Sequence, residues 1–121
     1  MTDTTTIPDS AEPLVLEKND WRVEIHLRRD EDEIATLLAY AGREHTPERA
    51  MHQGPFQRID QAIGARRAIV GAMLADGYRL LEEELPIWTL NAQRDINSIR
   101  ERKELSSASY KFDPKDVFLD W

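Results

Sequence analysis

The chain has 121 residues, a formal net charge of −7 at pH 7 and no cysteine. This length indicates one domain, large enough to bury a core without disulfides or a structural metal. The lack of cysteine excludes thiol nucleophiles, iron–sulfur clusters and cysteine-ligated zinc. No apolar run approaches the roughly 20 residues that span a bilayer, and the first residues lack the pattern of a secretory signal. We therefore expect a cytoplasmic protein without membrane contacts.

The N-terminal third predicts a leader followed by a hairpin. Residues 1–13 are rich in Thr, Asp, Pro and Ser, which predicts a disordered leader. Trp21, Val23, Ile25 and Leu27 then alternate with polar residues, the pattern of a strand with one buried face. Residues 14–17 precede a turn-prone stretch and are the expected hairpin partner of this strand. On its polar face, a histidine at position 26 is expected to be solvated or ion-paired.

The next segments predict two helices. In residues 30–42, Asp30 is a capping residue with Glu33 three positions later, and the apolar residues that follow share one helical face. A shorter helix is predicted from Thr46, with Pro47 in its first turn, up to the Gly54-Pro55 pair.

Residues 56–85 contain the longest predicted helix, because their apolar residues keep helical spacing. Its small residues form a face that another helix, including that of a second copy, can approach closely; they are Gly64, Ala68, Gly71, Ala72 and Ala75. Gly77 leaves two interpretations open: residues 78–84 continue the helix, which their Leu and Glu content favours, or they form a third strand. Pro86 begins a last helix over about 87–105.

Arg66 and Arg67 are expected to border the apolar stripe and pair with the protein's own acids, with an anionic ligand as the alternative.

The C-terminal segment holds an unusual number of aromatic residues. Four of the nine aromatic residues lie in the last twelve positions. Asp113 as a cap and Pro114 in the first turn predict a short helix, which is too short to be stable unless it docks. We expect it to dock on its own domain, or alternatively in a groove of another protein or a second copy. The predicted partner-binding residues are Tyr110, Phe112, Asp116, Val117, Phe118, Asp120 and Trp121.

These elements predict a predominantly helical α+β fold. A strand or hairpin at the N-terminus would pack on a small bundle of about three helices. The domain would span residues 14–107, preceded by the leader at 1–13 and followed by an aromatic and acidic docking segment at 108–121.

The predicted function is a non-enzymatic protein-protein interaction: an adaptor, an assembly chaperone or an inhibitor that acts through an acidic surface and the C-terminal anchor. The acidic balance argues against direct binding to nucleic acid, and no cofactor, metal site or catalytic residue is expected. One alternative is an acidic inhibitor that imitates nucleic acid and blocks a DNA- or RNA-handling enzyme. The other is a small metal-dependent or acid/base enzyme that uses His45, Glu48 and His52, although Pro47 would start a helix after His45 and separate it from the other two.

Overall fold

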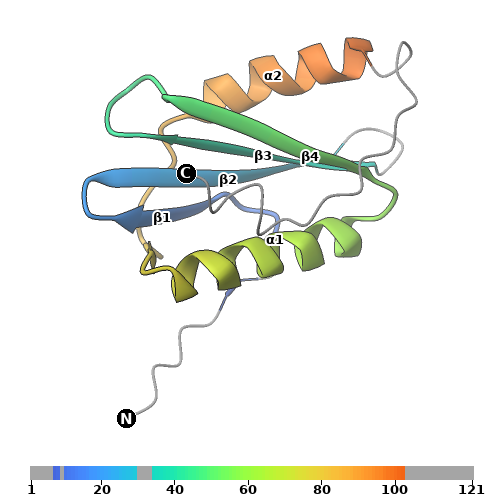
Figure 1. Cartoon of the computed structure of the whole chain (residues 1–121). Coiled ribbons are helices and arrows are strands. Elements are labelled where there is room, and N and C mark those ends of the chain that lie inside the picture. Colours follow the sequence, from blue (N-terminus) through green and yellow to red (C-terminus); the bar gives the residue numbers. More distant parts are fainter. Residues whose placement is uncertain (1–6, 9, 30–33, 103–121) are drawn as a thin grey trace.

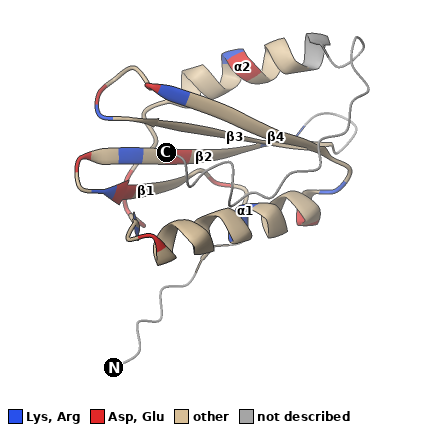
Figure 2. Cartoon of the chain, viewed as in Figure 1, with Lys and Arg blue, Asp and Glu red and all other residues tan. Residues whose placement is uncertain are grey.

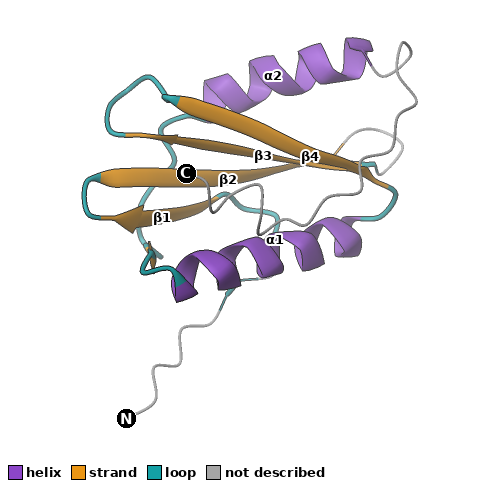
Figure 3. Ribbon diagram, viewed as in Figure 1, coloured by secondary structure: helices purple, strands orange, loops and turns teal. Residues whose placement is uncertain are grey.

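The computed structural model describes residues 7–8, 10–29 and 34–102. The elements in these residues are β1 (Leu14–Lys18), β2 (Trp21–Arg29), β3 (Ala35–Gly42), β4 (Arg49–Phe56), α1 (Ile59–Ala75), β5 (Arg79–Leu80) and α2 (Thr89–Arg102). The strands form one antiparallel sheet in the order β4-β3-β2-β1-β5. Helix α1 covers one face of the sheet and α2 covers the other (Figures 1 and 3). In the described part of the chain, neither helix is long and apolar enough to cross a bilayer.

The expectation of a predominantly helical protein with a bundle of about three helices is therefore wrong. The predicted helix at 30–42 is strand β3 over its described part, and the predicted helix after Thr46 is strand β4. Every residue of β3 is buried, because the strand lies in the sheet interior with a helix over each face. A strand buried on both faces is apolar throughout and lacks the period-two alternation that would distinguish it from a helix.

The predicted hairpin is confirmed. Strand β1 pairs with β2 so that Leu14 lies opposite Ile25 and Leu16 lies opposite Val23. Asn19 occupies the turn with a φ of 58°, a conformation that Asn adopts more readily than most residues.

Glycine 77 ends α1, so the continuous helix to residue 85 is wrong, and of the alternative third strand over residues 78–84 only Arg79–Leu80 form a strand. Gly77 has a φ of 102°, and β5 then pairs antiparallel with β1. The last predicted helix is confirmed as α2, which begins at Thr89 and is described to Arg102.

The sheet has a core on each face, because successive side chains of a strand point to opposite sides. On the α1 side, Ile25 of β2 and Leu37 of β3 belong to a cluster with Ile69 and Met73 of α1. On the α2 side, a smaller cluster joins β3 to the segment that leads into and forms α2; its buried members are Leu38, Tyr40, Trp88, Ala92 and Ile96. The polar face of β2 is thus covered by α2 instead of facing solvent.

The segment before β1 is tied to α1 by a buried arginine. Arg66 is 0% exposed. Its Nη1 donates to the carbonyl of Glu12 at 3.2 Å, and its Nη2 donates to the carbonyls of Pro8 at 3.0 Å and Ser10 at 2.6 Å. Burial lowers the pKa of this guanidinium. The expected pairing of Arg66 with acidic side chains is therefore wrong, since its hydrogen-bond partners in the described part of the chain are main-chain carbonyls.

Charged residues gather at the end of the sheet where the β1–β2 and β3–β4 turns lie (Figure 2). Arg43 Nε lies 3.2 Å from Asp20 Oδ2, and Arg43 Nη1 lies 3.4 Å from Glu48 Oε2, which links the two turns. The Arg43 guanidinium also stacks on Trp21, with 4.8 Å between Cζ and the ring centroid. These contacts are exposed, so each contributes little to stability.

Candidate functional site

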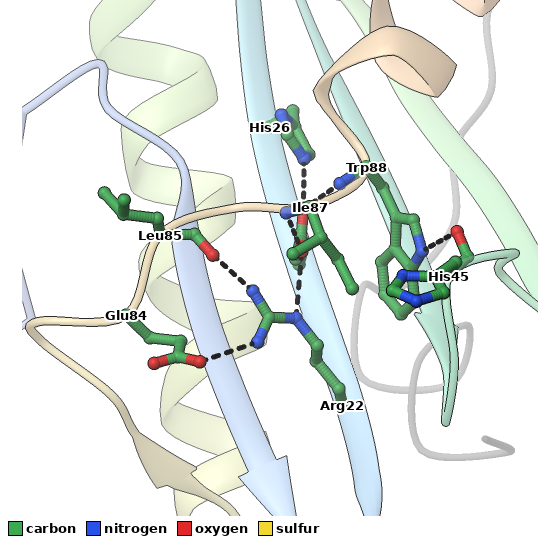
Figure 4. Close-up of polar contacts among 8 residues, drawn as sticks. Arg22, His26, His45, Glu84, Leu85, Ile87 and Trp88 are labelled. Atoms are coloured by element: carbon green, nitrogen blue, oxygen red, sulfur yellow. Dashed lines mark hydrogen bonds and ion pairs between the residues drawn. The ribbon is translucent and has the colours of Figure 1, made fainter.

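A buried carboxylate, Glu24, lies at the centre of the sheet face that α2 covers. Its side chain is 0% exposed. Oε1 accepts hydrogen bonds from Nε2 of His26 at 2.8 Å and from the main-chain nitrogen of Trp88 at 3.1 Å. Oε2 accepts from Nε of Arg22 at 2.9 Å and from the main-chain nitrogen of Ile87 at 2.7 Å (Figure 4). Four donors thus surround one carboxylate, which offers about four acceptor positions.

The hydrogen bonds keep Glu24 ionised in spite of its burial. Burial disfavours the charged form and by itself raises the pKa of Glu24. The hydrogen bond from His26 lowers this pKa, and the main-chain groups of Ile87 and Trp88 and the Arg22 side chain lower it further, so that the pKa of Glu24 lies below its ordinary value. Because the ionised carboxylate only accepts, Nε2 of His26 carries the proton in this contact.

The same cluster fixes the chain that leads into α2. Arg22 donates from Nη1 to Oε1 of Glu84 at 3.2 Å and from Nη2 to the carbonyl of Leu85. The buried indole of Trp88 donates from Nε1 to the carbonyl of His45 at 2.9 Å. Figure 4 shows these contacts converging from β2 and the β3–β4 connection on residues 84–88. The main chain of this segment is therefore anchored immediately before α2 begins.

The anchored segment carries exposed apolar side chains. Leu85 is 79% exposed, Ile87 is 49% exposed, and Leu90 in the first turn of α2 is 84% exposed. We call these three residues the 85–90 patch. Glu82, Glu83 and Glu84 precede it and are also exposed. Single exposed apolar residues are ordinary, but three within six residues on a fixed main chain form a candidate contact surface.

A second polar link holds the body of α2 to the sheet. The Tyr40 hydroxyl donates to Oδ2 of Asp95 at 2.8 Å, and the Tyr40 ring meets the His26 ring edge to face with centroids 5.8 Å apart. Burial raises the pKa of Tyr40, and the neighbouring Asp95 raises it further. The tyrosine is therefore protonated at neutral pH and acts as a donor.

A family model described as PA4575-like protein matches residues 1–116. The chain belongs to the PA4575-like family. A comparison with curated proteins and one with solved structures gave no match. The family match spans every strand and helix of the described residues, and therefore includes Glu24 and the 85–90 patch.

The described structure of this PA4575-like protein does not place on one helix the residues of the alternative metal site, His45, Glu48 and His52. His45 and Glu48 lie in the β3–β4 connection and His52 lies in β4, so the helix that was to align them is absent from this described region. Glu48 instead pairs with Arg43. Within the described ranges, no group of three or more His, Asp or Glu residues is arranged to hold a metal ion.

The predicted partner-binding residues, from Tyr110 to Trp121, lie outside the described residues. Sequence reasoning missed the Glu24 cluster, because it assigned the polar face of the second strand to solvent. The sequence held one signal for the cluster. The last predicted helix has an apolar face that must pack against another element, and the polar face of the hairpin was the sheet surface to which no helix had been assigned.

Proposed function

We propose that this PA4575-like protein is a non-enzymatic interaction protein that binds a protein partner as an adaptor, assembly chaperone or inhibitor. The observation that carries the proposal is the 85–90 patch on its anchored main chain. We also propose that it acts in the cytoplasm, in keeping with its lack of cysteine.

The anchor favours binding because it fixes the contact surface before a partner arrives. Binding costs free energy when loops and side chains must be ordered, and a preformed surface reduces that cost. Here, Glu24 and Arg22 hold residues 84–88 through main-chain contacts, which leaves the apolar side chains of the patch free to enter a partner's pocket. An apolar centre with a polar rim is the usual arrangement of a protein-protein interface.

The acidic surroundings favour a partner with a basic surface. Glu82, Glu83 and Glu84 border the patch, and the chain carries a net charge of −7. Such charges increase the association rate with a basic partner and repel nucleic acid. The outer face of α1 offers a second site for a further copy of the chain, since in the described part of the chain a Cβ added at Gly64 or Gly71 would meet no atom within 4 Å outside its own neighbours and helix backbone.

The test replaces two apolar residues of the patch. The Leu85→Ser/Leu90→Ser variant removes exposed side chains, so its urea midpoint should match that of the unmodified protein. Proteins that co-precipitate with the unmodified chain should be depleted at least tenfold with this variant, because each buried leucine contributes about 1.5 to 3 kcal/mol and about 1.4 kcal/mol is tenfold in affinity.

The matched control is Ala11→Ser, an exposed apolar-to-serine change in the segment before β1, outside both the patch and the outer face of α1. It should retain the same co-precipitating proteins. Equal recovery with the patch variant and the control would contradict the proposal, as would the absence of any protein that binds the unmodified chain selectively.

A further inference from the structure

A cleft of about 620 Å³ opens at the end of the sheet where Arg43 links the two turns. The β1–β2 turn, the β3–β4 connection, the start of β4 and the end of α1 supply its lining. Its volume falls in the range of small-molecule sites, about 300 to 1,000 Å³. The lining includes Asp20, Trp21, Arg43, Glu48, Arg49 and Tyr78.

Two aromatic side chains line the cleft. Tyr78 is a buried member of the cluster on the α1 side of the sheet, and the half-buried Trp21 packs against the same cluster. Each ring holds a cation of the chain, with Arg43 Cζ 4.8 Å from the centroid of Trp21 and Lys18 Nζ 5.6 Å from the centroid of Tyr78. The cleft therefore combines apolar rings with charged groups, which suits a ligand that has both an apolar and a charged part.

The ion pairs of the cleft leave one negative charge in excess. Lys18 and Asp76 pair with each other at 3.3 Å and cancel. Arg43 is shared by two carboxylates, with Asp20 at 3.2 Å and Glu48 at 3.4 Å. One guanidinium thus serves two carboxylates, so this group has a residual charge of the sign that attracts a ligand ammonium.

Arg49 adds one positive charge in excess. Its side chain is exposed and lines the cleft, and within the described ranges it has no acidic partner and no side-chain hydrogen bond. Glu48 and Arg49 are consecutive residues, so their Cα atoms lie about 3.8 Å apart. The cleft therefore presents an unpaired cation beside a carboxylate that shares its guanidinium with another acid.

We infer that this cleft binds a zwitterionic α-amino acid with a large apolar side chain. Such a ligand carries its ammonium and its carboxylate on one carbon, so the two charges meet neighbouring partners. The ligand carboxylate pairs with the guanidinium of Arg49, whose planar fork matches a carboxylate. The ammonium pairs with Glu48 and Asp20, and the apolar side chain covers the exposed part of the Trp21 ring.

The charge of the whole chain also favours a zwitterion. A net charge of −7 repels a simple anion, whereas a ligand without net charge approaches without this penalty. The cleft lies on the α1 side of the sheet, and the inference does not depend on the proposed function, which concerns the 85–90 patch.

The test titrates the full chain with L-phenylalanine at about 0.15 M salt, which screens non-specific attraction. NMR follows the indole N–H resonance of Trp21, identified among the three tryptophans by its loss in Trp21→Phe. This resonance should shift saturably, with a dissociation constant of about 1 mM or lower. Phenylalaninamide lacks the carboxylate, N-acetylphenylalanine lacks the ammonium and glycine lacks the side chain, so each should bind at least about tenfold more weakly.

Two variants assign the charges to residues. Arg49→Met should weaken phenylalanine binding about tenfold and leave phenylalaninamide binding unchanged. Glu48→Gln should weaken phenylalanine binding and leave N-acetylphenylalanine binding unchanged, because it removes the negative charge in excess. The matched control is Arg94→Met, an exposed change on α2, which covers the other face of the sheet, and it should bind phenylalanine as the unmodified chain does. Backbone amide spectra check that each variant is folded.

The inference is overturned if L-phenylalanine produces no saturable shift, or if Arg94→Met weakens binding as much as Arg49→Met. Equal binding of N-acetylphenylalanine would make the cleft a site for a simple anion, and equal binding of phenylalaninamide would make it a site for a simple cation. Equal binding of glycine would remove the two rings from the site.

Discussion

At the scale of single residues, Glu24 shows how a polar position on a strand becomes an anchor. Glu24 lies between Val23 and Ile25 in β2, and its side chain points to the opposite face of the sheet. Its fully buried carboxylate accepts four hydrogen bonds. The two main-chain donors precede α2, so the carboxylate also lies at the positive end of the helix dipole. Both contributions depend on the negative charge.

Glu24→Gln should lower the free energy of unfolding by about 1 to 3 kcal/mol, because the amide nitrogen cannot accept hydrogen bonds and the buried donors that face it lose their acceptor. The amide also brings donors toward groups that already donate. Urea denaturation at pH 7 measures the effect. Glu17→Gln is the control, since Glu17 pairs with the exposed Arg79 and its loss should cost less than about 1 kcal/mol. Equal urea midpoints for the two variants would contradict the role of Glu24.

The lowered pKa of Glu24 predicts a dependence on pH. Because its pKa is lower in the folded state than in the unfolded chain, ionisation stabilises the fold; the contribution is complete above the unfolded value of about 4.3 and is lost as pH falls through the folded value. The stability difference between the unmodified protein and Glu24→Gln should therefore be constant near pH 7 and shrink below about pH 4. Urea titrations of both proteins from pH 7 to pH 3 test this. A difference that persists unchanged at pH 3 would contradict it.

At the scale of elements, the end of α1 depends on one backbone conformation. Gly77 has a φ of 102°, whereas Gly71 lies within α1, where among the described residues a Cβ would meet nothing within 4 Å apart from its own neighbours and helix backbone. Gly77→Ala should destabilise the protein by about 1 to 3 kcal/mol through backbone strain. Gly71→Ala should stabilise it by about 0.5 to 1 kcal/mol through helix propensity. Thermal unfolding of the two variants checks the opposite signs, and a shift in the same direction for both would contradict this account.

The segment before β1 is a second case in which one side chain positions a whole stretch of chain. Arg66→Met keeps the apolar stem but removes the donors to the carbonyls of Pro8, Ser10 and Glu12. Limited proteolysis should cut residues 7–13 several times faster in this variant. Arg49→Met, an exposed change on β4, should leave the cleavage rate unchanged. Equal cleavage in both variants would show that Arg66 does not hold the segment.

At the scale of the whole molecule, the burial and pairing of each strand predict its local stability. Strand β3 is buried on both faces and paired on both sides, whereas β4 and β5 lie at the ends of the strand order. Amide exchange should be slowest in residues 21–29 and 35–42, and at least about tenfold faster in residues 79–80, because exposed edges open by local fluctuations. Hydrogen exchange followed by mass spectrometry measures this order, and exchange in β5 as slow as in β3 would contradict it.

Local patterns were sufficient to predict the hairpin of β1 and β2, the body of α1 and nearly the whole of α2. In each of these, one apolar face and its boundary residues lie within a single stretch of sequence, so that periodicity and turn chemistry determine the element. The acidic charge and the lack of cysteine also follow from the sequence by itself.

Only the tertiary structure decided that β3 and β4 are strands and that Glu24 is an anchor. Leu37 and Leu38 lie on opposite faces of β3, and both are buried because α1 and α2, which follow later in the chain, cover the two faces. The apolar run of β3 is compatible with either a helix or a strand, and pairing with β2 selects the strand. Glu24 likewise becomes buried only when residues 87 and 88, more than sixty positions later, supply its donors. Such contacts between distant segments leave no local pattern in the sequence.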